Sequence, residues 1–326
     1  MMKEQHDFTA VTGRDAYFAK LEEELRLLVD PETGKLRSDI ASVIPCPNCG
    51  CGEYAPLWSK NGFDFVCCTS CKLIYTNPQV NRDVVLSLYK GASEADNMWA
   101  RVLQSPEQQA FNARYYGEVL DIVQSYLPAG HVLDIGCSVG TFMSHAIARG
   151  FAATGLELNE EAAALAEADG LKVVRQTIEE FNPEAGQFQL MTLFGVLEHL
   201  NNPKEVLHTI YGALDPGGYL FLHVPNVNSL ATLVMQQRSK TFDGRNHLIY
   251  FSVDTLRCMA ESVGFRAVYS DTCIAGADQI VRTLRAGDGT VMLGGPLQAL
   301  LADGPELEKL LKRYDLGYRI RMMFVK

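Results

Sequence analysis

The sequence lacks any run of apolar residues long enough to cross a membrane, for which about 18 uncharged apolar residues are needed. The first 14 residues contain no apolar segment of the kind that a secretion signal requires. An excess of positive charge is also lacking, because 29 lysines and arginines stand against 39 acidic residues, a formal net charge of −10. Polyanions bind to positively charged surfaces, so this balance argues against a nucleic-acid partner. We therefore expect a cytoplasmic protein without a membrane span.

The chain is longer than a typical single domain. Its 326 residues, 47% of them hydrophobic and 21% charged, suit one full catalytic domain with a large core and a smaller accessory unit. The composition along the chain predicts an N-terminal helical extension (1–44), a metal-organised ribbon of short hairpins (45–80), a helical linker or lid (81–129) and an α/β domain (130–326). The oligomeric state is not indicated by any of these features.

Six of the nine cysteines lie within residues 46–71. In a chain without a secretion signal, such clustering favours metal binding over disulfides. Two C-x2-C pairs, 18 residues apart, suit a tetrahedral zinc site with four thiolate ligands. The expected ligands are Cys46, Cys49, Cys68 and Cys71. A site closed by four cysteines is structural, because catalytic zinc keeps one position open.

Two alternatives remain for this site. Cys67 could replace Cys68 in a C-x3-C arrangement, and Cys51 could serve as a spare ligand. An iron–sulfur cluster uses the same type of ligand as zinc. The two C-x2-C pairs give the simplest site, so we expect zinc on those four thiolates.

From residue 131 onward, short apolar runs alternate with amphipathic helical patterns. This alternation predicts parallel strands joined by crossover helices, and so a doubly wound, Rossmann-like sheet of class α/β. The expected strands are 131–136, 152–158, 172–176, 188–194, 217–224, 265–270 and 318–325. Such a sheet binds its ligands at the carboxyl ends of its strands.

The first of these strands leads into a glycine-containing loop. Asp134 is followed by Gly136 and Gly140, and the next residues begin a helix. Glycines allow close approach to the main chain, and a helix N-terminus favours a bound anion. The dinucleotide fingerprint G-x-G-x-x-G fails in this register, since Ser138 and Thr141 occupy its second and third glycine positions.

An acidic residue ends the second strand. Glu157 lies 17 residues beyond Gly140, where a carboxylate can accept hydrogen bonds from two vicinal ribose hydroxyls. The loop and this acid together indicate a ligand that contains a ribose.

The pattern D-x-G-x-S-x-G at residues 134–140 resembles the first motif of class I S-adenosylmethionine-dependent methyltransferases, from whose usual D-x-G-x-G-x-G it departs at Ser138. The segment LFGVLEHLNNPKEVLHTIYGALDPGGYLFLHVPNVNS resembles the region between the fourth and fifth strands of that family. The resemblance covers about residues 130–265 and is particularly close to bacterial methyltransferases with an N-terminal zinc ribbon. It implies a seven-stranded methyltransferase sheet, S-adenosyl-L-methionine as methyl donor, and a small-molecule acceptor such as a sugar, a lipid-linked intermediate or a secondary metabolite, methylated at oxygen or carbon.

The same resemblance implies a set of cofactor-binding residues. Residues 176–178, after the third strand, would border the adenine, and residues 194–195 would line the methionine side. The full expected set is Asp134, Gly136, Cys137, Gly140, Glu157, Gln176, Thr177, Ile178, Phe194 and Gly195.

Methyl transfer to a hydroxyl or a carbon acid requires a base, and histidine titrates in the useful pH range. His199 and His247 are expected on the substrate side, together with Glu198. Glu198 also has a structural interpretation as a salt-bridge or helix-terminus residue, and His223 suits a buried core position in its apolar strand. Other polar residues expected near the acceptor are Asn226, Asn228 and Tyr250.

Two other functions fit parts of the sequence. The ribbon could act as a reader in an RNA or protein methyltransferase, or the chain could be an inactive binding module. The acidic net charge argues against RNA. The retained Asp134, Gly136, Gly140 and Glu157 argue against loss of the methyl-donor site.

Overall fold

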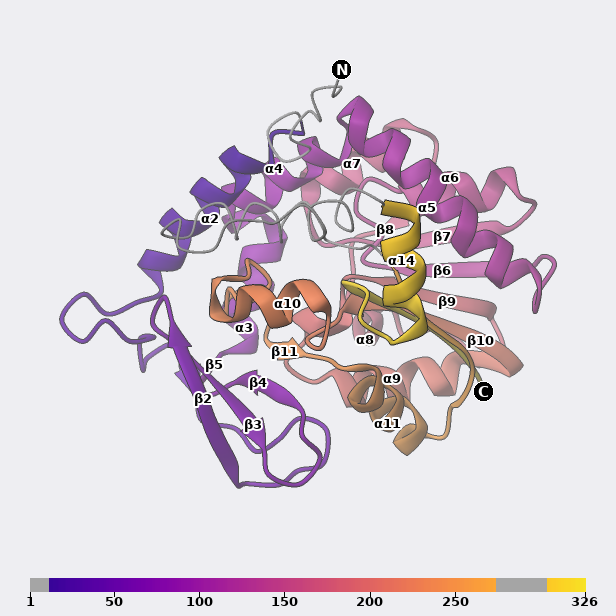
Figure 1. The fold of residues 1–326 in the computed structure, drawn as a ribbon. Helices are drawn as coiled ribbons and strands as arrows, with labels where there is room; N and C mark the ends of the chain where they lie inside the picture. The colour runs from indigo at the N-terminus through magenta and orange to yellow at the C-terminus, as the bar shows by residue number, and fades with distance from the viewer. Residues whose placement is uncertain (1–11, 274–303) are drawn as a thin grey trace, which may run out of the picture.

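The computed structural model describes residues 12–273 and 304–326, and every structural statement below refers to these residues. A twisted sheet lies between two groups of helices, and a smaller hairpin unit packs beside it (Figure 1). Within the described residues, no helix has the length and apolar character needed to cross a bilayer.

The main sheet has seven strands in the order β12-β13-β10-β9-β6-β7-β8. The strands are β6 His131–Ile135, β7 Ala152–Leu156, β8 Val173–Val174, β9 Phe188–Phe194, β10 Leu214–Pro225, β12 Arg266–Cys273 and β13 Arg319–Val325. Strands β8, β7, β6, β9 and β10 pair in parallel, whereas β13 is antiparallel to both β10 and β12. The predicted α/β class and doubly wound seven-stranded sheet are confirmed, and each expected strand is present with slightly different ends.

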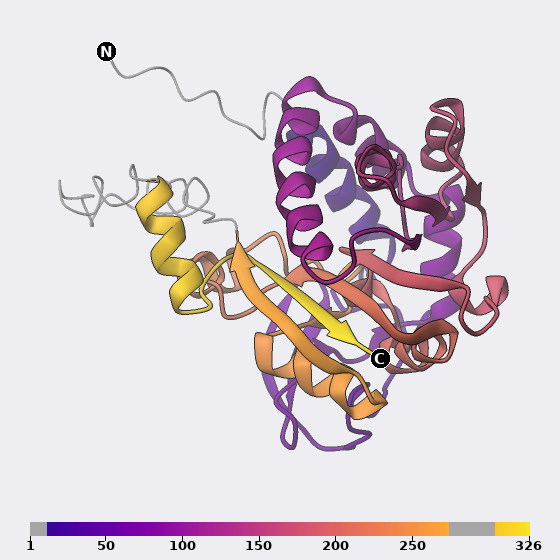
Figure 2. The same cartoon turned by 90° about the vertical axis from the view of Figure 1, so that its right-hand side faces the viewer.

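Helices cover both faces of this sheet. They are α5 Pro106–Gln124, α6 Thr141–Ala148, α7 Glu160–Ala168, α8 Ile178–Phe181, α9 Pro203–Ala213, α10 Leu230–Met235, α11 Val253–Val263 and α14 Gly304–Arg313. The Asn159 side chain caps α7, the Ser252 side chain caps α11, and Pro203 begins α9. Figure 2 shows β12 and β13 side by side with α11 below them.

The two faces of the sheet have separate cores, because successive strand residues point to opposite sides. In β9, Leu190 packs with residues of α5 and α6, whereas Met191 packs with residues of α9 and α11. The turn Leu197–His199 follows β9 at the carboxyl edge.

The hairpin unit precedes the main sheet in the sequence and gains one strand from the chain segment between β10 and β12. Its elements are β1 Ala41–Ser42, β2 Tyr54–Lys60, β3 Phe63–Cys68, β4 Ile74–Thr76 and β5 Gln79–Val80. Strand β11 (Ile249–Tyr250) pairs antiparallel with β4, so the four-stranded sheet β11-β4-β3-β2 combines two distant parts of the chain. The hairpins expected in this region are confirmed, whereas this pairing with residues 249–250 was not predicted.

Further helices join the hairpin unit to the main sheet. They are α2 Arg14–Leu27, α3 Arg82–Ser87, a π-helical turn at Leu88–Ala92, α4 Glu94–Leu103 and a 3-10 turn at Gln236–Arg238. Helix α2 lies within the segment 1–44 that was predicted to be a helical extension.

One buried arginine connects these helices with the loop after α10. Arg245 is 1% exposed in its side chain, and its guanidinium lies 3.0 Å from the Glu24 carboxylate of α2 and 3.3 Å from Asp96 of α4. Aromatic contacts add to this interface, since the Trp58 ring of β2 lies 4.9 Å from that of Phe242. The hairpin unit therefore packs against the loop after α10 through aromatic contacts, and α2 and α4 pack against the same loop through charged ones.

Candidate active site

The glycine loop between β6 and α6 is held in a left-handed backbone conformation. Gly136 and Gly140 have φ angles of 72° and 73°, and Ser138 between them has φ 51°. A Cβ atom on Gly136 would lie 2.5 Å from Val196, and one on Gly140 would collide with Leu171. These glycines are therefore required by the backbone conformation and by packing. The serine takes up a conformation that glycine adopts more easily, which explains why the usual motif has glycine there.

Glu157 lies against this loop, as the sequence predicts. Its carboxylate accepts hydrogen bonds from the backbone amides of Ser138 at 2.8 Å and of Leu158 and Asn159 at 2.7 Å each. Desolvation of this carboxyl raises its pKa, although the three amide donors act in the opposite direction. The glycine loop and the end of β7 are thereby joined through one side chain.

Asp134 and Cys137 lie beneath the loop instead of facing solvent. The Asp134 carboxylate, in a residue only 2% exposed, accepts a hydrogen bond of 2.7 Å from the Thr192 hydroxyl. Burial raises the pKa of Asp134 to about 7, and the nearby Glu157 charge adds to this rise. Burial also raises the pKa of the Cys137 thiol well above its usual range, which keeps it protonated and unreactive.

The residues expected near the adenine lie after β8. Thr177 and Glu180 form a reciprocal capping box at the start of α8, with the Thr177 hydroxyl accepting from the Glu180 amide at 3.2 Å. Ile178 is buried, while Gln176 is exposed. The Thr177 hydroxyl is thus already used by the helix that it caps.

The residues expected on the methionine side follow at the end of β9. The Phe194 ring packs against Phe142 at 4.6 Å and Tyr116 at 5.2 Å between ring centroids. Gly195 has φ 70°, and a Cβ placed on it would lie 3.6 Å from Glu198 Oε1. Gly195 therefore lies between the Phe194 ring, which packs among aromatic side chains, and the carboxylate of Glu198.

The three expected catalytic residues come together. Glu198 and His199 lie in the turn after β9, and His247 lies in the loop before β11. His199 Nε2 is 3.8 Å from Glu198 Oε1, and the two imidazole rings meet edge to face with centroids 4.9 Å apart. His247 Nδ1 donates a hydrogen bond of 2.8 Å to the Thr241 carbonyl. Burial and the neighbouring charges of His247 and Arg319 lower the pKa of His199 well below its usual range, so this imidazole is neutral near pH 7.

Glu198 is the most unusual member of this cluster. The residue is 1% exposed, and neither of its carboxylate oxygens has a hydrogen-bond partner among the described residues. Burial raises the pKa of this carboxyl, while the charges of His247 and Arg319 lower it. The nearest arginine nitrogen, Nη1 of Arg319, is 4.0 Å from Glu198 Oε1.

Two residues near the cluster escaped the sequence analysis. The Tyr89 hydroxyl lies 2.5 Å from His199 Nδ1, and Arg319 approaches Glu198 from the start of β13. Tyr89 belongs to the helical linker, 110 residues before His199, so local sequence patterns give no signal for it. Arg319 lies in a strand that the sequence predicts, but its contact with Glu198 depends on how that strand is placed in the folded sheet.

The other polar residues expected near an acceptor serve the backbone. The Tyr250 hydroxyl donates to the His247 carbonyl at 2.5 Å, and the Asn226 amide donates to the carbonyls of Asp315 and Gly317 at 2.9 Å. The backbone amide of Asn228 donates to the side-chain oxygen of Asn226. The His223 ring, in a partly buried residue, packs against the rings of Tyr115 and Phe194.

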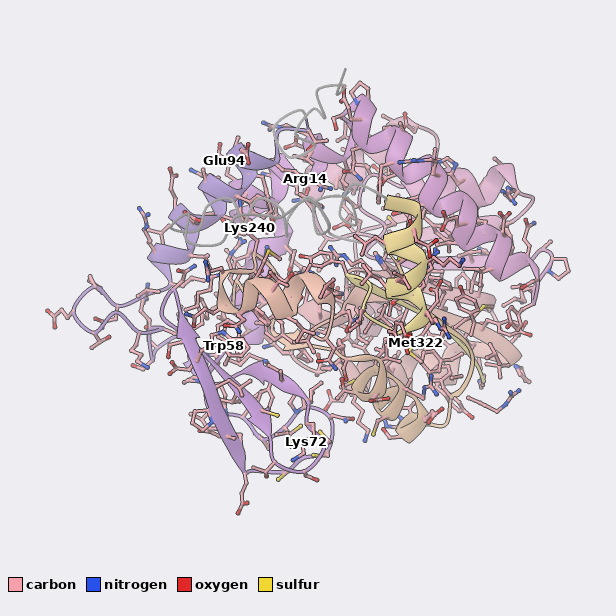
Figure 3. All side chains as sticks on the ribbon, viewed as in Figure 1. Arg14, Trp58, Lys72, Glu94, Lys240 and Met322 are labelled. Atoms are coloured by element: carbon pink, nitrogen blue, oxygen red, sulfur yellow. The ribbon has the colours of Figure 1, made fainter. Side chains whose placement is uncertain are left out.

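The four expected metal ligands also come together. The sulfurs of Cys46 and Cys71 are 3.5 Å apart, as are those of Cys49 and Cys68, and all four lie within 4.8 Å of one another. Thiolates around a tetrahedral zinc ion at 2.3 Å are separated by about 3.8 Å. In Figure 3, sulfur atoms gather beside Lys72 at one end of the hairpin unit. This geometry is that of a four-cysteine metal site.

The two alternative cysteines point elsewhere. The Cys67 sulfur contacts the carbonyls of Cys68 and Lys72, and the Cys51 sulfur contacts the Glu53 carbonyl and the Thr69 hydroxyl. Neither belongs to the group of four sulfurs. The ligand set formed by the two C-x2-C pairs is therefore the one whose sulfur atoms lie together.

The chain has recognisable relatives. Residues 109–270 match a family model described as a methyltransferase domain. The ubiquinone biosynthesis O-methyltransferase of Erwinia tasmaniensis is 35% identical over 111 residues, covering 32% of this chain and 45% of that protein. The enzyme of the same name from Marinobacter nauticus is 34% identical over 111 residues, covering 31% and 47%. The chain thus spans less than half the length of these relatives.

Solved structures with similar folds were also found. One is a methyltransferase of Thermotoga maritima described as a possible histamine N-methyltransferase, at 18% identity and a TM-score of 0.48, covering 70% of this chain and 98% of that one. Another is the 1,6-didemethyltoxoflavin-N1-methyltransferase of Burkholderia thailandensis with S-adenosylhomocysteine bound, at 15% identity and a TM-score of 0.48, covering 83% and 98%.

The family match covers the described strands β6 to β10, the glycine loop and Glu157, and it ends within β12. These parts of the chain carry the D-x-G-x-S-x-G motif and most strands of the seven-stranded sheet that the resemblance implies. Residues 109–270 therefore form a class I S-adenosylmethionine-dependent methyltransferase domain.

Proposed function

We propose that this protein transfers a methyl group from S-adenosylmethionine to a hydroxyl group or an activated carbon of a small molecule. The observation that carries this proposal is the cluster of Glu198, His199 and His247 beside Gly195. The position of this cluster supports an acceptor site next to the methionine side of the cofactor. The names of the two O-methyltransferase relatives support oxygen as the atom that is methylated.

Methyl transfer requires little covalent chemistry from the protein. The sulfonium is already a good leaving group, so the chain must mainly align the acceptor with the methyl carbon and exclude water. The acceptor's proton must also be lost. His199 is our first candidate for the base, because its lowered pKa leaves it neutral. His247 is the second, and Glu198 would stabilise the imidazolium that forms.

For the cofactor, we propose that Glu157 binds the ribose hydroxyls. A carboxylate offers about four lone-pair sites, and in this structure three are used by the amides of Ser138, Leu158 and Asn159. Two hydroxyls would therefore displace the Ser138 amide and move the glycine loop slightly. The rest of the proposed cofactor set remains as the sequence predicts it, with residues 176–178 at the adenine and Phe194 and Gly195 at the methionine side.

We also propose that Cys46, Cys49, Cys68 and Cys71 bind a structural zinc ion. Their sulfur positions fit a tetrahedral ion, and four cysteines leave no position open for chemistry. The zinc would stabilise the hairpin unit. The division of the chain at residues 44, 80 and 129 and a cytoplasmic location remain proposals from the sequence.

Calorimetric titration with S-adenosylmethionine tests the cofactor site. We expect Glu157→Gln to weaken binding by about 10- to 100-fold, because hydrogen bonds to a charged group are worth about 1.5–3 kcal/mol. Glu160→Gln is the matched control, since this neighbouring carboxylate is exposed on α7. If the wild-type chain binds no cofactor, the inactive binding module becomes the better interpretation.

Transfer of a tritiated methyl group tests the acceptor class. We expect incorporation into an extract of small metabolites, and none into total RNA or protein. Incorporation into RNA or protein alone would instead favour the ribbon as a reader of a macromolecular substrate.

A further inference from the structure

The cluster of Glu198, His199 and His247 offers more than a base. One carboxylate oxygen and two imidazole nitrogens lie within 4.8 Å of one another. We propose that these three residues bind a divalent cation, separate from the four-cysteine site, and that the cation takes the acceptor hydroxyl as a further ligand. The catalytic part of this inference rests on the proposed function, whereas the binding part does not.

The first argument is the isolation of the Glu198 carboxylate. It is 1% exposed, and both of its oxygens lack hydrogen-bond partners among the described residues. A buried carboxylate requires either a close positive charge or hydrogen-bond donors to compensate its desolvation. The nearest arginine nitrogen, Nη1 of Arg319, is 4.0 Å from Glu198 Oε1, beyond hydrogen-bond distance. A cation between Glu198 and the histidines would supply the missing partner.

The second argument is the orientation of the imidazole rings. His247 Nδ1 faces the Thr241 carbonyl at 2.8 Å, so this nitrogen carries a proton, and in the neutral imidazole Nε2 has the free lone pair. His199 Nδ1 faces the Tyr89 hydroxyl at 2.5 Å, which leaves its Nε2 towards Glu198. Metal-binding histidines are commonly held in this way, with the second ring nitrogen bonded to a carbonyl or another polar group.

The ligand set limits the choice of cation. Two imidazoles and one carboxylate suit first-row divalent ions such as Mn²⁺, Fe²⁺, Co²⁺, Ni²⁺ or Zn²⁺. The four-cysteine site prefers softer ions, because its ligands are all thiolates. Three protein ligands leave at least one coordination position open for an acceptor oxygen. Arg319 opposes a second positive charge here, but its side chain is 28% exposed and has room to turn towards solvent.

The chemistry that follows is a metal-assisted O-methylation. A hydroxyl bound to a divalent cation loses its proton more readily, and the proton passes to solvent. The oxygen then forms a bond to the methyl carbon of S-adenosylmethionine, and the bond between that carbon and sulfur breaks with its electron pair remaining on sulfur. While the cation is bound, the imidazoles serve as its ligands, and its charge takes the place of the base proposed above.

Titration of the zinc-loaded full chain with Mn²⁺, followed by the electron paramagnetic resonance signal of free Mn²⁺, tests this inference. We expect about one Mn²⁺ to bind per chain. Glu198→Gln keeps the size of the side chain but removes its charge, and we expect it and His247→Ala to weaken binding by at least about tenfold. His208→Ala, which removes an exposed histidine of α9, is the matched control and should bind Mn²⁺ as the wild type does.

The thermal midpoint and calorimetric binding of S-adenosylhomocysteine establish that each variant is folded. The inference is overturned if the folded wild type binds no Mn²⁺, or if Glu198→Gln binds it as tightly as the wild type. Mn²⁺ binding without any methyl transfer would support the site and contradict the proposed function. Methyl transfer at an unchanged rate in a chain that binds no Mn²⁺ would support the proposed function and contradict the cation site.

Discussion

Asp134 carries an electrostatic cost that one substitution can remove. Burial raises its pKa to about 7 from an ordinary value of about 3.9. The folded protein therefore holds a proton that the unfolded chain releases, and stability falls as the pH rises from about 4 to 7. Above pH 7 the loss is complete and constant.

Asp134→Asn should abolish this pH dependence, because the amide has no charge to bury and its oxygen can still accept the Thr192 hydroxyl. The free energy of unfolding in urea, measured for both proteins at pH 5 and pH 8, checks this. We expect the variant to gain more than about 1 kcal/mol over the wild type between the two pH values, since one pKa unit corresponds to about 1.4 kcal/mol. Parallel pH profiles for the two proteins would contradict it.

At this scale the sequence predicts individual residues better than their surroundings. Glu198 and His199 could be selected because they follow a recognisable strand of the main sheet, and His247 because histidine titrates in the pH range that suits a base. Tyr89 and Arg319 could not, since their contacts with the cluster depend on side-chain orientation across distant segments. The lack of partners at Glu198 is equally a property of the folded arrangement.

Among the elements, β11 connects the metal unit to the proposed active site. The Thr76 amide of β4 donates to the Leu248 carbonyl at 3.0 Å, and the Leu248 amide donates to the Glu198 carbonyl at 2.9 Å. His247 immediately precedes this pair of hydrogen bonds. The sheet beside the four cysteines therefore also holds the backbone next to His247.

Cys68→Ser combined with Cys71→Ser should disturb both sites. We expect the loss of about one zinc ion per chain, faster hydrogen exchange at the amides of Thr76 and Leu248, and a fall in methyl transfer, because β4 loses the metal that fixes it. Metal analysis and hydrogen–deuterium exchange measure the first two effects. Cys67→Ser is the control, since its sulfur lies outside the group of four.

Zinc loss with unchanged hydrogen exchange at the Leu248 amide would contradict this coupling.

The individual elements were largely predictable, because apolar periodicity indicates strands such as β9 and helices such as α11. The pairing of β4 with β11 was not, since a two-residue strand such as β11 has no periodicity, and its residues pair with partners 174 and 176 positions away in the sequence (Ile249 with Tyr75, Tyr250 with Ile74).

Across the whole molecule, contacts between the hairpin unit and the α/β domain predict one cooperative unfolding transition. The buried Arg245 binds Glu24 and Asp96, and the two units share a sheet. Unfolding one unit alone would leave these charges buried without partners or expose the shared edge. The two tryptophans, Trp58 and Trp99, lie in β2 and α4, outside the main sheet, so their fluorescence reports the N-terminal half.

We expect the thermal midpoint from tryptophan fluorescence to coincide with that from far-ultraviolet circular dichroism, which mainly reports the larger α/β region. A separate, earlier fluorescence transition would contradict a single cooperative unit. The class of fold and the grouping of four cysteines were predictable from composition and spacing. The interlocking of the two units was not, because it depends on tertiary contacts between residues such as Glu24 and Arg245.

Strand β11 also has a consequence for the order of events on the ribosome. The four cysteines leave the ribosome early and can bind metal at once, but β4 waits for its partner until residues 249–250 have been synthesised. Until then, the edge of β4 that faces β11 has backbone groups without strand partners, and such edges favour misassembly of nascent chains. The hairpin unit is thus synthesised before the main sheet, but its own sheet is completed only after residues 249–250.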